Sequence, residues 1–486
     1  MKVIYGLGLL LALAACSEQN AVPNKLQSEP DEALSAGQAT GFRVTAGAFS
    51  EASSNISFER KGDFLIGNDF FEDPWVIAPS STKIRDGLGP LFNVSSCQSC
   101  HVNDGRGHAP DDGGTNFASL LIRSSRSKLS DEQLAQMEAG LLAHVGDSKV
   151  GGQLQDRSIP GVPAEISTRV TYITKTITLS DNETVELRQP IWHLTNHYGE
   201  FDEDTILSVR VAPPMIGLGL LEQIDEADIF ALADPDDQNQ DGISGRANMV
   251  WDVEASQVRL GRFGLKAGQP TVRQQVAAAF NGDLGLTTSL FPKEGCEPNQ
   301  IECLSMPTGK GPGEAYEIRD DVLDFVTFYS RNLAVPIRRN VDLPAVLRGR
   351  AIFNDIGCAS CHVAQFTTTH SDEHIEQSEQ VIRPYTDLLL HDMGEELADV
   401  SVNNEAQQFQ LVEFKANARE WRTAPLWGIG LTHIVDDEAS FLHDGRARTI
   451  LEAVLWHGGE AEASKQQVVD MSAAEREDLL AFLYSL

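Results

Sequence analysis

Apolar positions recur at helical spacing near two points of the chain, residues 322–330 and 479–486. The second stripe follows Ser472-Ala-Ala-Glu475, a sequence typical of a capping box, in which the Ser and Glu side chains each bond a free backbone N–H. The first stripe ends before Pro336, which cannot continue a helix. Leu347–Phe353 has the same periodicity. The pattern predicts a helix at each of these places.

The two halves of the chain also resemble each other. Thr271–Ala279 parallels Thr449–His457, and each segment precedes one of the two closing helices. An additional region, about residues 110–260, has no counterpart in the second half. In it, Ser130–Val145 is predicted to be helical, and the alternation over Val170–Leu187 predicts a β-hairpin that turns at Ser180-Asp-Asn182. We interpret this region as an insertion.

Two Cys-x-x-Cys-His motifs carry the candidate chemistry. They consist of Cys97, Cys100 and His101, and of Cys358, Cys361 and His362. This is the attachment signature of c-type haem, in which two thioethers hold the vinyl groups and the next residue supplies the proximal iron ligand. A zinc site would need further Cys or His at close spacing, which neither motif has, and a redox dithiol rarely carries the His. The motifs therefore predict two covalently bound haem c groups.

Helix, haem motif, long loop and closing helix form the plan of a small cytochrome c domain. This order of elements predicts two cytochrome c-like haem domains, residues 41–336 and 343–486, the first enlarged by the insertion. Cys296 and Cys303 remain outside the haem motifs. In an oxidising compartment they are expected to form a local disulfide that closes a loop.

The N-terminus has the pattern of an export signal. Lys2 precedes an apolar run, Val3–Leu13, that is too short to span a membrane as a mature helix. The run ends in Leu13-Ala-Ala-Cys16, which resembles a bacterial lipoprotein cleavage box, so residues 1–16 are expected to be a signal with Cys16 as the lipidated residue. Ser17 after it resembles sorting to the outer membrane. Residues 17–40 are polar and predict a flexible tether in the periplasm.

The charge balance limits the partners. With 71 acidic against 38 basic residues the net charge is −33, which argues against nucleic acid because phosphate requires Lys and Arg. An acidic surface either serves solubility or attracts a cationic partner, such as a small basic cytochrome that donates electrons.

Several stretches together resemble the family of di-haem oxidoreductases that are related to bacterial di-haem cytochrome c peroxidases. They cover most of residues 60–486 and are Gly89–Asn93, Cys97–Gly107, Gly151–Gln155, Pro213–Glu222, Asp237–Asn248, Gly261–Pro270, Pro384–Asp399 and Trp421–Ala461. The resemblance implies a mainly α fold with two facing cytochrome c-like domains, and it implies haem-based redox chemistry. It does not fix the substrate, for which hydrogen peroxide is one expectation.

The sixth iron ligand decides which haem carries electrons and which reacts. His457 in the second half lies opposite Ala279 in the first, and a shift of one residue gives Phe280, which is not a ligand either. In the peroxidase relatives the residue corresponding to His457 resembles the distal ligand of the C-terminal haem. We therefore expect His457 to complete the second haem and the first to be open or weakly ligated. Met393 is the rival ligand of the second haem; for the first haem, Met215 or His108 remains an alternative.

A peroxidatic site also needs an acid–base group and a stabilising cation. Glu222 is the candidate for the first role and Arg210 for the second, with structural salt bridges as the alternative. His443-Asp-Gly-Arg446 resembles a loop of the peroxidase relatives near the second haem, where Arg446 would contact a propionate. Trp427 and Trp456 flank this region and form a candidate electron path, with core packing as the alternative.

Asp237, Asn239 and Asp241 alternate ahead of Gly242, the first half of a calcium loop. The twelfth position is Asn248 where the full motif has Glu, so a complete EF-hand is not expected. The resemblance, since di-haem peroxidases carry a calcium ion between their domains, favours calcium here over a metal-free turn.

Three functions remain open at this stage. The first is a peroxidase-like enzyme in which electrons pass from the second haem to the first. The second is an anchored electron-transfer cytochrome with both irons saturated. The third is a redox accessory of a cell-surface assembly, such as one for iron acquisition, for which the lipid anchor is the main clue.

Overall fold

The computed structural model describes residues 27–115 and 118–486, so Cys16 and the predicted signal lie outside the described residues. Helices account for 27% and strands for 19% of the structure, so the prediction of a mainly α fold is wrong. The long connections between helices contain alternating β-branched residues, and these pair as strands in several small sheets. No helix of the described residues is long and apolar enough to cross a membrane.

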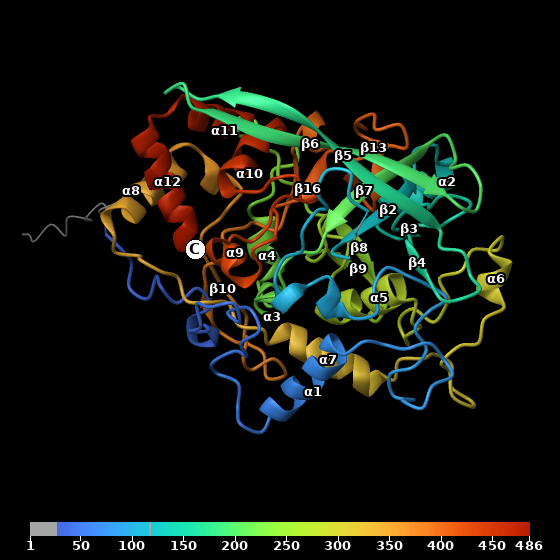
Figure 1. The fold of residues 1–486 in the computed structure, drawn as a ribbon. Coiled ribbons are helices and arrows are strands. Elements are labelled where there is room, and N and C mark those ends of the chain that lie inside the picture. Colours follow the sequence, from blue (N-terminus) through green and yellow to red (C-terminus); the bar gives the residue numbers. More distant parts are fainter. Residues whose placement is uncertain (1–26, 116–117) are drawn as a thin grey trace, which may run out of the picture.

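The α-helices are distributed through the molecule, with the first at the lower edge of Figure 1 and the last at its left side. They are α1 (Lys61–Glu72), α2 (Asp131–Glu138), α3 (Leu218–Glu222), α4 (Glu226–Phe230), α5 (Val272–Leu284), α6 (Ile301–Leu304), α7 (Asp320–Arg331), α8 (Pro344–Asp355), α9 (Thr432–Val435), α10 (Ile450–Trp456), α11 (Glu462–Asp470) and α12 (Ala473–Ser485). The three helices expected from periodicity are α7, α8 and α12, and α12 begins with the predicted capping box.

The strands form one four-stranded sheet and six antiparallel pairs. The larger sheet has the order β13 (Val400–Ser401), β7 (Thr205–Val211), β2 (Leu120–Arg126), β3 (Gln153–Leu154). The pairs are β1 (Leu91–Phe92) with β4 (Arg157–Ser158), β5 (Ile166–Thr178) with β6 (Thr184–Asn196), β8 (Met249–Asp252) with β9 (Gln257–Leu260), β10 (Phe366–Thr367) with β11 (Val381–Ile382), β12 (Leu390–Asp392) with β16 (Glu420–Arg422), and β14 (Leu411–Glu413) with β15 (Ala416–Asn417).

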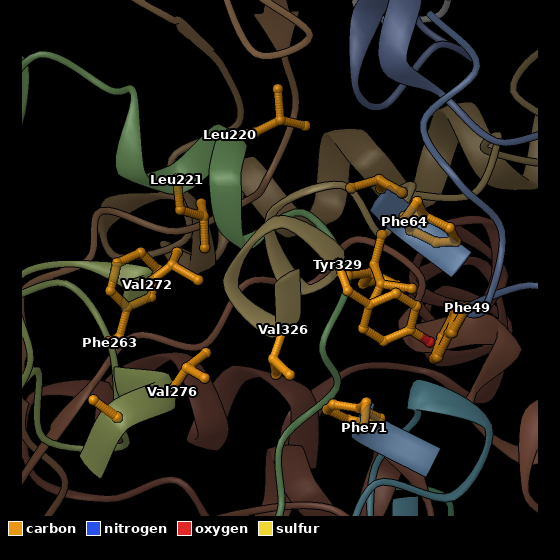
Figure 2. Packing of buried hydrophobic residues seen from close by; sticks show 14 of the residues in the cluster. Phe49, Phe64, Phe71, Leu220, Leu221, Phe263, Val272, Val276, Val326 and Tyr329 are labelled. Atoms are coloured by element: carbon orange, nitrogen blue, oxygen red, sulfur yellow. The ribbon is translucent and has the colours of Figure 1, made fainter. Parts of the chain in front are cut away.

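In each half a closing helix crosses a helix that precedes the haem motif, α7 with α1 and α12 with α8. A glycine allows each crossing, because a Cβ on Gly67 would lie 2.2 Å from the Phe325 carbonyl and one on Gly349 would lie 1.9 Å from the Asp478 carbonyl. Figure 2 shows the first crossing, where the ring of Tyr329 packs between aromatic side chains of α1. The repeat seen in the sequence therefore includes α1, which the periodicity did not predict.

The predicted hairpin is confirmed, with β5 and β6 in continuous register from Ile166 to Thr178. It extends along the upper side of the molecule in Figure 1 and reaches α11 and α12. Leu179 and Leu187, at its tip, are buried in the core of the second half. Arg476 of α12 contacts Asp181 at 2.6 Å and Glu183 at 2.8 Å. The tip of the insertion therefore packs into the second half and is bound there by Arg476.

Replacement of Arg476 by Ala should weaken this contact between the hairpin and α12. Removal of a largely buried guanidinium that binds two carboxylates is expected to cost roughly 1–3 kcal/mol, between the values for exposed and buried ion pairs. The measurement is the midpoint of thermal unfolding of the holo-protein. Arg348→Ala serves as the control, because it removes an exposed arginine of α8 that pairs with Asp478 of α12. Equal losses of stability in the two variants would contradict the claim that Arg476 holds the hairpin against the second half.

Candidate functional site

Both Cys-x-x-Cys-His motifs fold into the same local structure, a 3₁₀ turn over Cys97–Ser99 in the first and over Cys358–Ser360 in the second. Nδ1–H of His101 donates to the Pro213 carbonyl at 2.8 Å, and Nδ1–H of His362 donates to the Tyr385 carbonyl at 2.9 Å. A carbonyl partner fixes the tautomer, so Nε2 of each ring keeps its lone pair for a metal. Burial lowers the pKa of both imidazoles to about 4, which keeps them neutral.

The two motifs open onto one continuous cavity in the interior. It is lined by all six motif residues and by His457, Met393, Met215, Arg210, Trp427 and Ala279. Most of the surface of the cavity is apolar, as expected for a pocket that holds a large flat ligand. The tertiary structure therefore brings together, in one space, motifs that are 261 positions apart (His101 to His362).

His457 lines the same cavity as the second motif. It lies at the C-terminus of α10, and its Nδ1–H donates to the Ala453 carbonyl at 2.7 Å, which leaves Nε2 free. His457 and His362 both line the cavity. Met393 also lines the cavity and its carbonyl lies beside Gly458.

A buried polar cluster holds the loop that follows His457. Glu460 accepts a hydrogen bond from His391 at 2.7 Å, and His391 contacts Asp387 at 2.8 Å through its other nitrogen. Burial lowers the pKa of His391, but hydrogen bonds to Asp387, to the Cys361 sulfur and to Glu460 outweigh burial and raise this pKa to about 12. Cys361, Asp387 and His391 have the composition of a metal site, but hydrogen bonds already satisfy the His391 ring.

The helix of the first half that corresponds to α10 is α5, which contains no His, Cys or Met. Thr271 caps α5 as Thr449 caps α10, which supports the predicted correspondence of the two segments. Where α10 ends at His457, α5 continues as helix through Ala279 to Leu284. Gln275, Ala279 and Asp283 are four residues apart, share one face of α5 and all line the cavity.

Three predicted residues are occupied elsewhere, and none of them lines the cavity. Glu222 contacts Arg331 at 2.7 Å and accepts the Val272 N–H, so it secures the start of α5. Arg446 bonds Asp444, two residues away, at 2.7 Å and 2.9 Å. His108 lies nearest to Asp436 and Glu438 in a partly exposed loop.

The remaining candidates have mixed placements. Met215 lines the cavity two residues after Pro213, whose carbonyl accepts the hydrogen bond of His101. Arg210 lines the cavity and is paired with Glu413 at 2.6 Å. Trp427 lines the cavity and packs in the first core, whereas Trp456 is buried in the second core without reaching the cavity.

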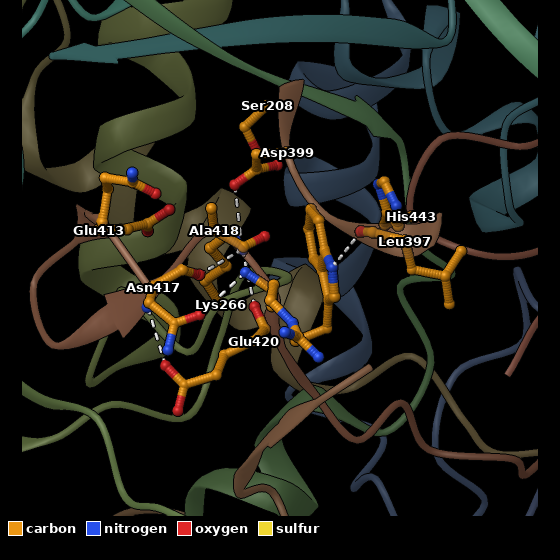
Figure 3. Close-up of polar contacts among 12 residues, drawn as sticks. Ser208, Lys266, Leu397, Asp399, Glu413, Asn417, Ala418, Glu420 and His443 are labelled. Atoms are coloured by element: carbon orange, nitrogen blue, oxygen red, sulfur yellow. Dashed lines mark hydrogen bonds and ion pairs between the residues drawn. The ribbon is translucent and has the colours of Figure 1, made fainter. Parts of the chain in front are cut away.

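A column of stacked groups near the cavity was not anticipated. The rings of Trp421 and His443 stack 3.8 Å apart at an angle of 12°, and Nζ of Lys266 lies 3.7 Å from the centre of the same indole. Lys266 is fully buried and contacts Asp399 at 3.1 Å (Figure 3). Trp421 and His443 line the cavity, and Asp399 lies in a stretch that carried the family resemblance. The Lys, Trp and His of this column are far apart in the sequence and form no periodic pattern, so the sequence did not predict it.

The acidic loop and the cysteine pair lie outside the cavity. Asn239 and Asp241 bond each other and the backbone of their own loop, and the Ser244 hydroxyl at the end of the loop donates to Glu460 at 2.6 Å. Cys296 and Cys303 are joined by a disulfide, with their Cα atoms 5.9 Å apart.

Two His-anchored motifs that share one apolar cavity define a protein with two haem sites. The chain belongs to the di-haem oxidoreductase family, since the family model described as "Di-haem oxidoreductase, putative peroxidase" matches residues 31–486. No curated protein matches the sequence. A structure of hydrazine synthase from Kuenenia stuttgartiensis is similar over 99% of this chain and 100% of that chain, with 14% identity and a TM-score of 0.36. A likeness of that extent defines neither the fold nor the activity.

Proposed function

We propose that this protein is a di-haem c-type cytochrome with peroxidase-like activity, in which the second haem carries electrons to a first haem that lacks a sixth protein ligand. Cys97 and Cys100 would attach the first haem, and Cys358 and Cys361 the second. His101 and His362 would be the proximal ligands. A haem iron with a free coordination position supplies the chemistry of oxidant reduction, whereas one with two protein ligands is suited to electron transfer.

The observation that carries this proposal is the difference between α5 and α10. His457 presents a free Nε2 to the cavity near His362, whereas the equivalent position on α5 is Ala279, in unbroken helix. The side chain of Ala cannot bind iron, and the neighbouring cavity positions on that face are Gln275 and Asp283. Of the two corresponding helices, therefore, α10 is followed by an imidazole at the cavity and α5 offers none.

Asp283 takes the place that the sequence suggested for Glu222. It lies one turn beyond Ala279 on the same face of α5, and Gln153 donates to it at 2.7 Å. Burial raises the pKa of this carboxyl, so it holds a proton more readily than an exposed Asp. Asp283 is thus the cavity group best placed to exchange a proton with an oxidant at the first site.

Electron paramagnetic resonance of the oxidised and half-reduced holo-protein, before and after hydrogen peroxide, tests the proposal. We expect a low-spin signal from the second haem and a high-spin ferric signal from the first that peroxide removes. Two low-spin signals that peroxide leaves unchanged in both states would instead make the protein an electron-transfer cytochrome.

Introduction of an imidazole at the empty position of α5 should close the first site. We expect Ala279→His to convert the first haem to low spin and to lower the rate of the peroxide reaction by at least roughly 100-fold, about 3 kcal/mol of activation free energy. The checks are the high-spin signal and the stopped-flow rate with peroxide. Ala279→Leu fills a similar volume without a ligand, and equal loss in the two variants would show obstruction instead of ligation.

We also propose a calcium ion in the loop of Asp237, Asn239 and Asp241, whose side-chain oxygens suit a hard cation. Isothermal titration of the chelator-treated holo-protein with calcium is expected to show one site. In Asp241→Asn the affinity should fall at least about tenfold, since a charged ligand is lost. Absence of binding heat in the native protein would leave the loop as a metal-free turn.

We propose a periplasmic location with a lipid on Cys16, on the basis of the sequence pattern alone. A small basic electron-donor protein suits the net charge of −33. Labelling of cells with radioactive palmitate, in the native protein and in Cys16→Ala, distinguishes a lipid anchor from a cleaved secretory signal.

A further inference from the structure

Three arginine side chains that line the cavity have no carboxylate partner among the described residues. Arg106 donates to the carbonyls of Ser440 and Leu442, and Arg422 donates to those of Gly264 and Thr423 at 3.0 Å each. For Arg123, no side-chain hydrogen bond or ion pair to another described residue is found. All three residues line the cavity, and a guanidinium is positively charged at any physiological pH.

Other buried arginines of this protein show what is missing. Arg210 contacts Glu413, Arg338 contacts Glu32, and Arg446 contacts Asp444. Burial of a charge without a counter-ion is costly, so proteins pair such groups as these three are paired. Arg446, which the sequence suggested for a haem carboxylate, is already neutralised within its own loop.

The nearest carboxylates do not replace the missing partners. The charges of Glu413 and Asp283 act on Arg123, that of Asp444 on Arg106 and that of Asp387 on Arg422, but no pair comes within the 4.0 Å of an ion pair. Burial remains the largest effect in each case and lowers the pKa of Arg106 and of Arg422 to about 10, and that of Arg123 below its usual range. The cavity therefore favours an anion at three separate points.

The positions of these arginines relate them to the two motifs. Arg106 follows His101 by five residues. Arg123 lies opposite Gln153 in the β2–β3 ladder, and the Gln153 side chain donates to Asp283 on the cavity face of α5 at 2.7 Å. Arg422 donates to the Thr423 carbonyl, which also accepts a hydrogen bond from the Thr386 hydroxyl at 2.7 Å, and Thr386 follows Tyr385, whose carbonyl accepts from His362. Two of the arginines thus lie beside the first motif and one beside the second.

We infer that Arg106 and Arg123 bind the propionates of the first haem and that Arg422 binds a propionate of the second. Each haem carries two carboxylates, and a guanidinium fork binds a carboxylate through two parallel hydrogen bonds. This assignment rests on the proposed function in so far as the cavity holds two haems. It also gives Arg106 a second role, because its bonds to Ser440 and Leu442 link the first motif to the loop of His443.

The test uses the holo-protein with Arg106→Gln, Arg123→Gln and Arg422→Gln, each assayed by spectroelectrochemistry and by resonance Raman spectroscopy of the propionate bending mode. Loss of the cation leaves a propionate unneutralised, which favours ferric iron. We expect about a tenfold change in the ratio of oxidised to reduced haem, equivalent to 59 mV for one electron. The first two variants should lower the potential of the first haem, and the third that of the second haem. Arg348→Gln, an exposed arginine on α8, should change neither.

A variant that fails to retain haem is replaced by its Lys counterpart, which keeps the charge but loses the fork. Arg123→Lys should then keep the potential and still shift the Raman mode. Unchanged potentials and Raman modes in all three Gln variants would overturn the assignment.

A free carboxylate is the other source of the same chemistry. If acetate shifts the potential of the native holo-protein but not that of Arg123→Gln, the arginine binds a free carboxylate and the propionate assignment is wrong. Paramagnetic resonance separates the two proposals, since a sixth ligand on the first haem would refute the peroxidase but leave the potential shifts in place.

Discussion

In His457→Ala, the second haem is expected to change from low spin to high spin, and the catalytic rate with an electron donor should fall by roughly 100-fold or more. Even the loss of groups that only support a metal ligand costs about 10–100-fold, so loss of the ligand itself should cost at least as much. The neutral ring of His457, held by the Ala453 carbonyl, would otherwise saturate the iron opposite His362. Absorption and paramagnetic resonance spectra of the holo-protein measure the spin state directly.

Met393→Leu is the matched control for this prediction. Met393 lines the same cavity, and its carbonyl lies beside Gly458, so it is the only sulfur ligand considered for this haem. We expect its replacement to leave the low-spin spectrum unchanged. The opposite result, a spectrum altered by Met393→Leu and not by His457→Ala, would exchange the ligand roles of the two residues.

The backbone after His457 provides a second check. Gly459 has a φ of 55°, and a Cβ there would lie 2.2 Å from the Asp392 carbonyl. Gly459→Ala should therefore displace the loop and weaken ligation while it leaves the imidazole in the sequence. A mixture of high-spin and low-spin second haem is the expected spectrum.

The largest effect on stability is expected at the buried pair of Lys266 and Asp399. Removal of one partner leaves an uncompensated charge in the interior, so Asp399→Asn should destabilise the protein by about 3–5 kcal/mol. Three backbone carbonyls around the Lys266 ammonium offset part of its charge but none of them is an anion. The measurement is the shift in the thermal unfolding midpoint of the holo-protein.

Lys266→Met combined with Asp399→Leu tests the same interpretation from the other side. Removal of both charges should recover most of the stability that the single change loses, because an ion pair can be replaced by apolar groups of similar volume at little cost. For comparison, the exposed pair of Arg348 and Asp478 should contribute no more than about 1 kcal/mol. If Asp399→Asn lowers the stability by less than this exposed pair contributes, the interpretation that Asp399 compensates the buried charge of Lys266 is wrong.

The tertiary structure also explains why some site residues could not be found in the sequence. Arg123 and Arg210 lie on β2 and β7, and β7 is separated from β2 by the whole hairpin. The sequence of neither strand shows which of the two arginines pairs with a carboxylate. Arg210 does so, because Glu413, about 200 positions later, lies beside it in the fold. Glu222, similarly, is bound by Arg331 and by the start of α5, which lie beside it in the fold, and it does not line the cavity.

What the sequence determined by itself is the chemistry that depends on short spacing. The two Cys-x-x-Cys-His motifs, the capped closing helix, the hairpin turn and the pairing of Thr271–Ala279 with Thr449–His457 all follow from residues a few positions apart. Local hydrogen bonds and side-chain periodicity fix these features without help from the rest of the chain.

Only the tertiary structure decided the fold class, the common cavity and the partner of each buried charge. Short strands such as β12 and β16 exist because distant segments pair, and an isolated segment of three residues has no preference strong enough to reveal this. Whether an arginine is neutralised, like Arg446, or remains available to a ligand, like Arg123, depends on contacts across the whole chain. Long-range packing therefore determined which of the polar residues serve the site.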